Sequence, residues 1–229
     1  METKDSIVDL IQKCLNLGKS PNEHEAQLAM SKAQELLEKY NLTLADLKPE
    51  EQQAHINMVS IPVPIGRSEW KRRLIHYIAQ QSFCKVVISG EKVYVLGRSA
   101  NVYSTLVMAS WIVAQLENIA WLETTTYAGY LPKLRFRDSF LWGAIDRISE
   151  RLKEERQTRE ATSPNLHALV VNLSTEVSLY TSTQFPHMSS HHIGKSFSSE
   201  AYQKGRAAGD TVSIYGGDRQ LHSSQKLLT

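Results

Sequence analysis

The sequence has few of the residues and motifs that identify an enzyme. Only two of its 229 residues are cysteine, Cys14 and Cys84, and their spacing fits neither a zinc motif nor a redox pair. We expect both to be small buried side chains in a reducing compartment, without a disulfide. A Gly-x-Ser-x-Gly elbow, a cysteine with a nearby histidine and asparagine, and the paired acidic motif of a nuclease are also missing. These absences favour a protein without catalytic activity.

The chain also lacks a large excess of charge of either sign. The chain has 26 basic and 24 acidic residues, which gives a formal net charge of +2. So small an excess predicts neither nucleic-acid nor membrane binding, because such binding needs a concentrated patch. The first residues, METKDS, lack the basic region and apolar run of a secretory signal. We therefore expect a cytoplasmic protein.

No long hydrophobic run is uninterrupted. The most apolar segment extends from Ser99 or Asn101 to about Thr124, long enough to span a membrane, but Gln115 and Glu117 break it and no basic flank orients it. We expect a core helix there, and no membrane contact. Its apolar residues include Val102, Leu106, Val107, Met108, Trp111, Ile112, Val113, Leu116, Ile119, Trp121 and Leu122.

What the sequence has in abundance is helical periodicity, most clearly near its beginning. Asn22 and Glu25 have the spacing of a capping box, and Asn41 is placed to end the same helix in the left-handed conformation. An earlier helix stops at Gly18. The stripe of the first helix is Ile7, Leu10, Ile11, Cys14 and Leu15, and that of the second is Ala26, Ala29, Met30, Ala33, Leu36, Leu37 and Tyr40. The pattern predicts a helical hairpin.

The same stretch carries a family resemblance. The segment KCLNLGKSPNEHEAQLAMSKAQELLEKYNLTLADL resembles the N-terminal module of the domain of unknown function 2786 family, which occurs in bacteria, phages and other mobile elements. The resemblance covers roughly residues 4–47, and residues 66–215 resemble the domain that often follows this module. It implies an architecture and a phage, plasmid or defence setting. It supplies no catalytic residues.

Short strands and long helices are predicted after the hairpin. Residues 55–63 indicate an edge strand, because Pro62 cannot donate to a central ladder. Ser68 should cap a helix that buries Trp70, Leu74, Tyr77 and Ile78. Residues 85–88 and 93–96 predict a β-hairpin that ends at Gly97.

The second half of the chain is also predicted to contain long helices and short strands. A turn-rich loop at 124–132 precedes a long helix with the stripe Phe140 to Leu152 and a charged tail, broken at 162–165. Residues 167–171 and 177–181 suggest two more strands, and 182–196 has loop composition. A last helix begins near Ser198 or Ser199, with Gly205 and Gly209 spaced for close approach to a neighbour.

These elements predict an α+β fold, in which an N-terminal helical hairpin is followed by a small, mainly antiparallel sheet packed on long helices. We divide the chain into a hairpin module at 1–47, a linker at 48–54, an α+β domain at 55–215 and a flexible tail at 216–229.

Two short segments combine cations with aromatic residues. Folding that brings them together would let lysine and arginine contact the phosphates of a nucleic acid, with an affinity that falls as salt rises. Alternatively, Trp70 and Phe136 are core anchors and the cations a solvated face. The candidates are Arg67, Lys71, Arg72, Arg73, Lys133, Arg135 and Arg137.

Two weaker sites remain. Gly97, Arg98 and Ser99 lie where a strand turns into a helix, and free helix N–H groups beside an arginine can bind an anion. The alternative is a tight turn with a serine cap. His187, His191 and His192 are spaced to share Zn²⁺ if their loop folds back, but no Cys, Asp or Glu completes the ligand set. We predict no metal and no cofactor.

The leading hypothesis is a non-catalytic nucleic-acid-binding or complex-forming accessory protein of a phage, mobile-element or defence system. A protein–protein adaptor acting through the helical hairpin is the first alternative. A metal-dependent hydrolase that uses the histidine cluster is the second.

Overall fold

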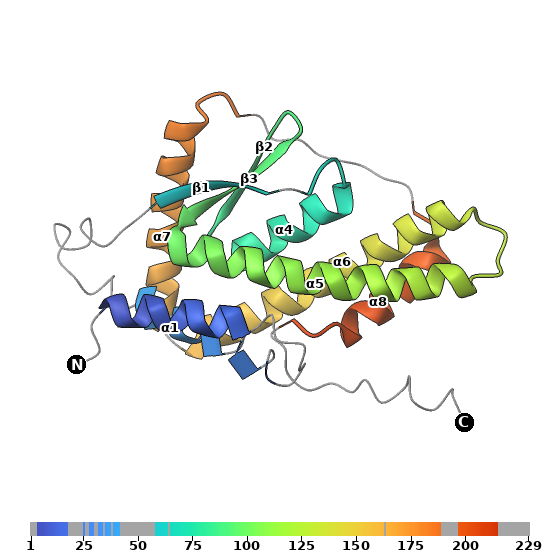
Figure 1. Ribbon diagram of the computed structural model, residues 1–229, viewed down its shortest axis with the longest axis horizontal. Coiled ribbons are helices and arrows are strands. Elements are labelled where there is room, and N and C mark those ends of the chain that lie inside the picture. Colours follow the sequence, from blue (N-terminus) through green and yellow to red (C-terminus); the bar gives the residue numbers. More distant parts are fainter. Residues whose placement is uncertain are drawn as a thin grey trace.

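The computed structural model describes residues 4–17, 58–63, 65–162, 164–188 and 197–214. Within 25–41 it describes positions 25, 28, 29, 32, 33, 35–37 and 39–41. Figure 1 shows a small sheet and long helices, with α7 standing beside the sheet and α1 lying along α5. The α+β prediction is confirmed. The predicted linker, the turn between the first two helices with Gly18 and Asn22, and the tail lie outside the described residues.

The sheet has three antiparallel strands in the order β1-β3-β2. They are β1 (Met58–Val63), β2 (Lys85–Ser89) and β3 (Lys92–Arg98). β1 is an edge strand, as Pro62 predicted. Gly90 opens the two-residue turn between β2 and β3 at φ 60°, a conformation that glycine adopts without strain.

Helices cover both faces of this sheet. α4 (Glu69–Gln81) and α5 (Ser99–Thr126) share a core cluster with Val93 and Val95 of β3. The alternate residues of β3 meet α7 (Pro164–Gln184) and the residue after it, since Arg98 pairs with Glu176 and the centre of the Tyr94 ring lies 5.3 Å from that of Phe185. Because β3 is central and covered on both sides, its second half is buried throughout.

Among the described helices, α5 alone is long and apolar enough to cross a membrane. Length and composition are weak evidence for a span, because the core helix of a soluble protein meets the same criteria. Here α5 contacts β3, α4 and α6 and buries Val102, Ile112 and Leu116 completely. Its last turns differ from the predicted core stripe, because Trp121 and Leu122 are exposed.

The N-terminal helices pack on the same core. α1 (Lys4–Leu17) contacts α5, and every described position from 25 to 41 is helical. Ile11, Ala33 and Leu37 are at most 1% exposed and belong to the central cluster, so these stripe positions are buried as predicted. Leu10, predicted to be in the stripe, is 37% exposed.

Asn41 does not end its helix in the left-handed conformation, as its residue type suggested. It is helical and fully buried, and its amide nitrogen donates to the Leu37 carbonyl and to Asn101 Oδ1, each at 2.9 Å. Its own oxygen accepts from Arg98 at 3.1 Å. A tertiary polar network therefore determines this asparagine's conformation.

The two strands predicted at 167–171 and 177–181 are wrong, because both segments lie in α7. Pro164 opens this helix at the first position, where proline has no hydrogen bond to lose. Leu173, Val177 and Thr181 are buried at four-residue spacing. Its hydroxyl groups bond to carbonyls one turn back, as Ser178 Oγ does to Ser174 O at 2.6 Å. Helical burial thus overrides a β-branched composition.

α6 (Lys133–Thr162) and α8 (Ser199–Thr211) form the closest helix pair, which we call the α6–α8 seam. A Cβ added to Gly143 would lie 2.0 Å from the Tyr202 carbonyl oxygen, and one added to Gly205 would lie 1.9 Å from that of Phe140. Gly209 is similarly tight against Ala144. The close approach predicted for α8 is confirmed, and its partner is α6.

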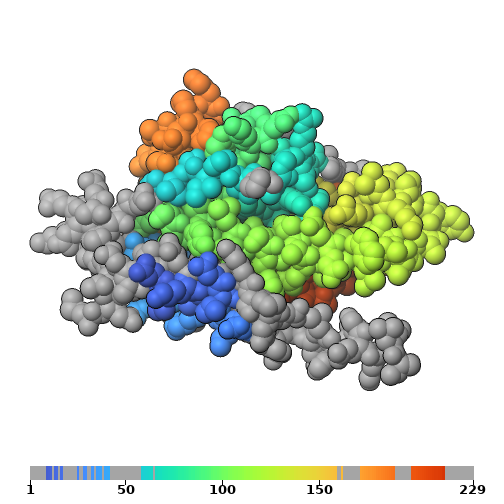
Figure 2. Space-filling model, in the orientation of Figure 1, coloured from blue at the N-terminus to red at the C-terminus, as the bar shows by residue number. Residues whose placement is uncertain are grey.

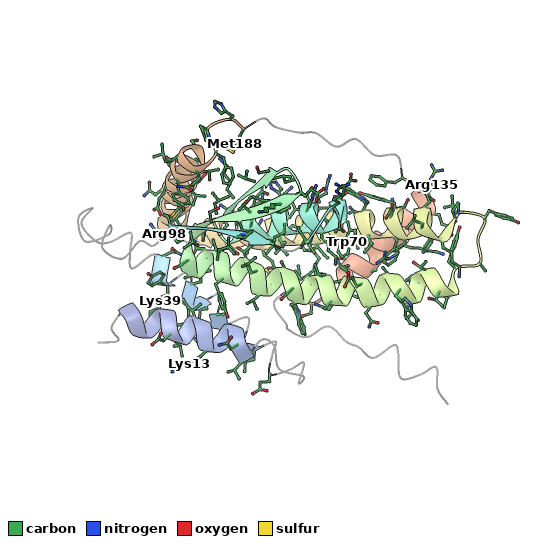
Figure 3. The ribbon with its side chains drawn as sticks, turned by 45° about the horizontal axis from the view of Figure 1, so that its top comes forward. Lys13, Lys39, Trp70, Arg98, Arg135 and Met188 are labelled. Carbon is green, nitrogen blue, oxygen red and sulfur yellow. The ribbon has the colours of Figure 1, made fainter. Side chains whose placement is uncertain are left out.

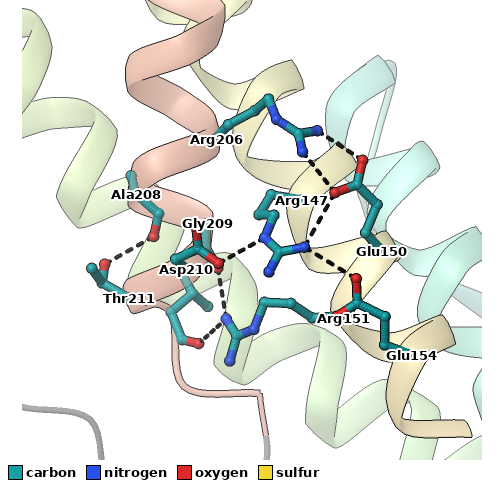
Figure 4. Close-up of polar contacts among 10 residues, drawn as sticks. Arg147, Glu150, Arg151, Glu154, Arg206, Ala208, Gly209, Asp210 and Thr211 are labelled. Carbon is teal, nitrogen blue, oxygen red and sulfur yellow. Dashed lines mark hydrogen bonds and ion pairs between the residues drawn. The ribbon is translucent and has the colours of Figure 1, made fainter.

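Charged side chains complete the seam (Figure 4). Arg206 binds Glu150 with both terminal nitrogens, at 2.8 and 2.7 Å, and Arg147 Nε donates to Asp210 at 2.7 Å. Arg151 donates to the carbonyls of Gly209 and Val212, at 2.6 and 2.8 Å, which stabilises the last turn of α8. The hydrogen bonds from Arg206 and then Arg147 lower the pKa of Glu150.

Candidate nucleic-acid interface

The first basic segment, residues 67–73, is bonded to the rest of the protein. Arg67 pairs with Glu91 and Lys71 with Glu117, the latter at 2.6 Å. Arg72 donates to the backbone carbonyls of Gly66 and Glu91, at 3.0 and 3.3 Å. These contacts hold the start of α4 against the β2–β3 turn and against α5.

Arg73 has the most extensive contacts of this segment. Its guanidinium lies 3.1 Å from Asp146 of α6 and 4.6 Å from the centre of the Trp142 ring. Asp146 also accepts a 2.7 Å hydrogen bond from the Tyr202 hydroxyl, so a single carboxylate joins α4, α6 and α8. This arginine helps to assemble the helices.

The aromatic residues of the two basic segments are core residues. Trp70 is 8% exposed and Phe136 is fully buried. Neither ring can stack on a base, so the structure supports the alternative reading of these two side chains.

The second basic segment is different. Lys133 donates to the Thr125 carbonyl at 3.3 Å, at the end of α5. Arg135 is exposed and Arg137 half-buried, and neither makes a hydrogen bond or ion pair within the described part of the chain. Residues 121–138 carry two carboxylates, Glu123 and Asp138, against three cations.

The segments lie on neighbouring helices, and Arg73 and Arg135 are far apart along them. α4 and α6 run side by side in the same direction, since Arg73 reaches Asp146 while Arg156, further along α6, reaches the Gln80 carbonyl. Arg135 lies eleven positions before Asp146, or about 16 Å along the helix axis. Figure 3 shows Arg135 at the outer end of α6 and Trp70 further inward.

Residues 121–137, which we call the α5–α6 tip, form that outer end (Figure 2). The tip is anchored from inside. The Tyr127 ring stacks on Phe136 at 4.0 Å and its hydroxyl accepts a hydrogen bond from Leu131 N at 3.3 Å. A Cβ on Gly129 would lie 2.2 Å from the Tyr127 hydroxyl, so glycine is required for this packing.

Large apolar side chains point outward from the anchored tip. Trp121 is 64% exposed, and Tyr130 is fully exposed. Leu122 and Leu134 are 54% and 70% exposed. Sequence reasoning missed these residues, because Trp121 and Leu122 fit the stripe of α5 and Tyr130 lies in a turn. A tyrosine between Gly129 and Pro132 was the available signal.

Arg98 is already bound to a carboxylate. Its side chain is 7% exposed and donates to both oxygens of Glu176, at 3.0 and 2.6 Å, as well as to Asn41. Ser99 begins α5 directly after β3, and no side-chain capping bond is present at that helix start. The sequence predicted that Arg98 would help to bind an external anion. Its guanidinium instead joins β3 to Glu176 of α7 and to Asn41 of the helix at 25–41.

The histidine cluster lies mostly beyond the described residues. His187 is exposed in the segment after α7, while His191 and His192 are not described. Within the described ranges, no group of three His, Cys, Asp or Glu side chains is placed to hold a metal ion.

Comparison with known proteins finds a match for one part of the chain. Residues 6–44 match the family model described as protein of unknown function (DUF2786). This confirms the resemblance of the N-terminal helices. No curated protein and no solved structure matches the chain, and the companion domain at 66–215 stays a prediction.

Proposed function

We propose that the protein is a non-catalytic nucleic-acid-binding accessory protein and that the α5–α6 tip contacts the nucleic acid. The observation that carries the proposal is the combination of two exposed aromatic rings, Trp121 and Tyr130, with Arg135 and Arg137, which have no partner among the described residues. Exposed rings stack on unpaired bases and cations bind the adjacent phosphates. Such a surface suits single-stranded nucleic acid, whose bases are unpaired.

The proposal refines the original set of seven cations. The bonds of Arg67, Lys71, Arg72 and Arg73 within the fold support a structural role for them. Lys133, Arg135 and Arg137 then supply the phosphate contacts. Action within a phage, mobile-element or defence system rests on the family resemblance. Action in the cytoplasm rests on the residue pattern of the first residues, METKDS.

Fluorescence anisotropy with labelled single- and double-stranded DNA and RNA tests the proposal at several salt concentrations. Trp121→Ala with Tyr130→Ala should weaken single-strand binding by about tenfold or more, since stacking contributes about 1–3 kcal/mol per base. Arg135→Ala with Arg137→Ala should weaken binding and lower its salt dependence. Lys13→Ala with Lys92→Ala is the matched control, because both are exposed lysines outside the tip.

The absence of binding to every nucleic acid at low salt contradicts the proposal. The adaptor reading then takes precedence, and it has its own observation. Leu17 and Leu28 of the N-terminal helices are 48% and 76% exposed, which gives these helices an outward apolar surface. Retention of a partner that requires both leucines, tested with Leu17→Ser and Leu28→Ser, would support it.

A further inference from the structure

A cavity of about 500 Å³ opens between the end of α4, the start of β2, α6 and α7. This volume lies within the range of small-molecule sites, about 300–1,000 Å³. It is separate from the α5–α6 tip. Its lining residues include Gln81, Phe83, Lys85, Lys153, Arg156 and Ser174.

The charge of this lining is one-sided. Lys85, Lys153 and Arg156 come from β2 and α6, and no carboxylate is among the lining residues. Lys85 donates to the Ser178 hydroxyl at 3.3 Å, and neither lysine has a carboxylate partner in the described part of the chain. Three cationic side chains thus line one cavity. Like charges repel each other, and a bound anion offsets that repulsion.

The remaining lining suits the organic part of a ligand. Gln81 is 5% exposed, and its Oε1 has no hydrogen-bond partner among the described residues. A buried amide oxygen without a donor costs about 1–3 kcal/mol, which an amino group of a ligand can relieve after a small rotation of the amide. Gln80 and Gln157 add further amides, and Phe83 adds a ring.

The cavity wall also contains strained backbone. Phe83 has φ 56°, a conformation rare for a residue with a large side chain. Arg156 covers its ring at 5.5 Å and donates to the Gln80 carbonyl at 2.8 Å. The surrounding packing thus holds Phe83 at the cavity, and strained residues of this kind cluster at ligand sites.

The thiol in the wall indicates binding rather than covalent chemistry. Burial raises the pKa of Cys84 to about 12, so the sulfur stays protonated at neutral pH and is a poor nucleophile. Its Sγ would lie 2.8 Å from a Cβ on Gly97. The cysteine is therefore a packing residue.

We propose that this cavity binds a phosphate-bearing small molecule of mononucleotide size, with Lys85, Lys153 and Arg156 on the phosphates and the glutamines on the base. The inference goes beyond the proposed function and does not depend on it. Phosphate esters match the three cations, and a base matches amides that both donate and accept.

Isothermal titration calorimetry of the full chain tests this with AMP, ADP, ATP and inorganic phosphate as probes. We expect saturable 1:1 binding of at least one nucleotide, tighter than that of inorganic phosphate. Lys85→Met with Lys153→Met should weaken binding by about tenfold or more, since 1.4 kcal/mol corresponds to tenfold. Lys13→Met with Lys92→Met removes equal charge elsewhere and should change binding by less than about twofold.

A second variant separates shape from charge. Ser174 is an exposed lining residue on α7, so Ser174→Trp should obstruct the cavity without removing a cation, and nucleotide binding should be lost while the melting temperature is kept. Trp121→Ala with Tyr130→Ala should leave mononucleotide binding unchanged, which separates this site from the tip.

Any of four results would overturn the inference. Three of them are no saturable nucleotide binding up to about 5 mM, a range that covers millimolar affinity, wild-type affinity in the Lys85 and Lys153 double variant, and binding of inorganic phosphate alone. Displacement of the mononucleotide by a single-stranded oligonucleotide would also overturn it, and would reassign the cavity to a nucleic-acid strand.

Discussion

The two basic segments have similar composition and opposite surroundings. At residues 67–73, cations are bonded to Glu91, Glu117, Asp146 and backbone carbonyls. At residues 133–137, Arg135 is exposed and Arg137 is half-buried, at the end of α6 that lies beyond α4 in Figure 1. Cations of the first kind stabilise the fold, whereas cations of the second kind remain available to a partner. Composition alone does not distinguish them.

Arg98 is the extreme case of a cation bonded within the fold, and we expect its loss to have the largest effect. Arg98→Met leaves Glu176 and Asn41 without their donor, and removing one member of a buried pair costs about 3 kcal/mol or more. Urea unfolding should show this decrease in stability. Lys92→Met, on the same strand but exposed, is the control. Equal midpoints for the two variants would contradict the structural role.

Arg73→Met should have the next largest effect. It removes the ion pair with Asp146 and the contact with Trp142. The side chain is 34% exposed, so we expect a loss of about 1–2 kcal/mol. Differential scanning calorimetry should place its melting temperature below that of Arg135→Met. A melting temperature equal to that of Arg135→Met would remove the distinction between the segments.

The contribution of the Glu150 ion pairs to stability should depend on pH. Its pKa is lowered in the folded protein by Arg206 and then Arg147. A lowered carboxyl pKa contributes stability above the unfolded pKa, and this contribution is lost as the pH falls through the folded value. The wild type should therefore melt slightly above Glu150→Gln near pH 7, and the difference should shrink below about pH 4. A difference that is constant with pH would exclude this ion pair as its cause.

Arg135→Ala with Arg137→Ala should have the smallest effect on stability. Neither side chain has a partner among the described residues, so the free energy of unfolding should change by less than about 0.5 kcal/mol. Chemical denaturation measures it. A loss above about 1 kcal/mol would place these arginines with the bonded cations.

The sequence predicted those features that depend on local pattern. The edge position of β1 followed from Pro62, and the close approach of α8 followed from Gly205 and Gly209. Features that depend on distant partners were missed. The segment at 167–181 has strand-like residues, but burial of Leu173 and Val177 stabilises α7, and its hydroxyl groups bond within the helix. Its helicity comes from tertiary packing.

The candidate site was harder to predict for the same reason. Whether Arg73 or Arg135 is bonded depends on where Asp146 lies after folding, and sequence spacing does not encode that position. Trp121 is exposed because the last turns of α5 extend past the elements that cover its earlier turns. Periodicity assigns a helical face, but it does not show where the covering elements end.

The α6–α8 seam also has a consequence for folding kinetics. Arg206 and Glu150 are 56 positions apart in the chain, and Arg147 and Asp210 are 63 apart. Closing a loop of that length costs entropy before any contact forms, so we expect α8 to dock after the transition state. Tyr202→Phe, which removes the hydrogen bond to Asp146, should then accelerate unfolding and leave the refolding rate nearly unchanged in stopped-flow experiments. The α6–α8 seam would then determine the unfolding rate, and so the lifetime of the folded state.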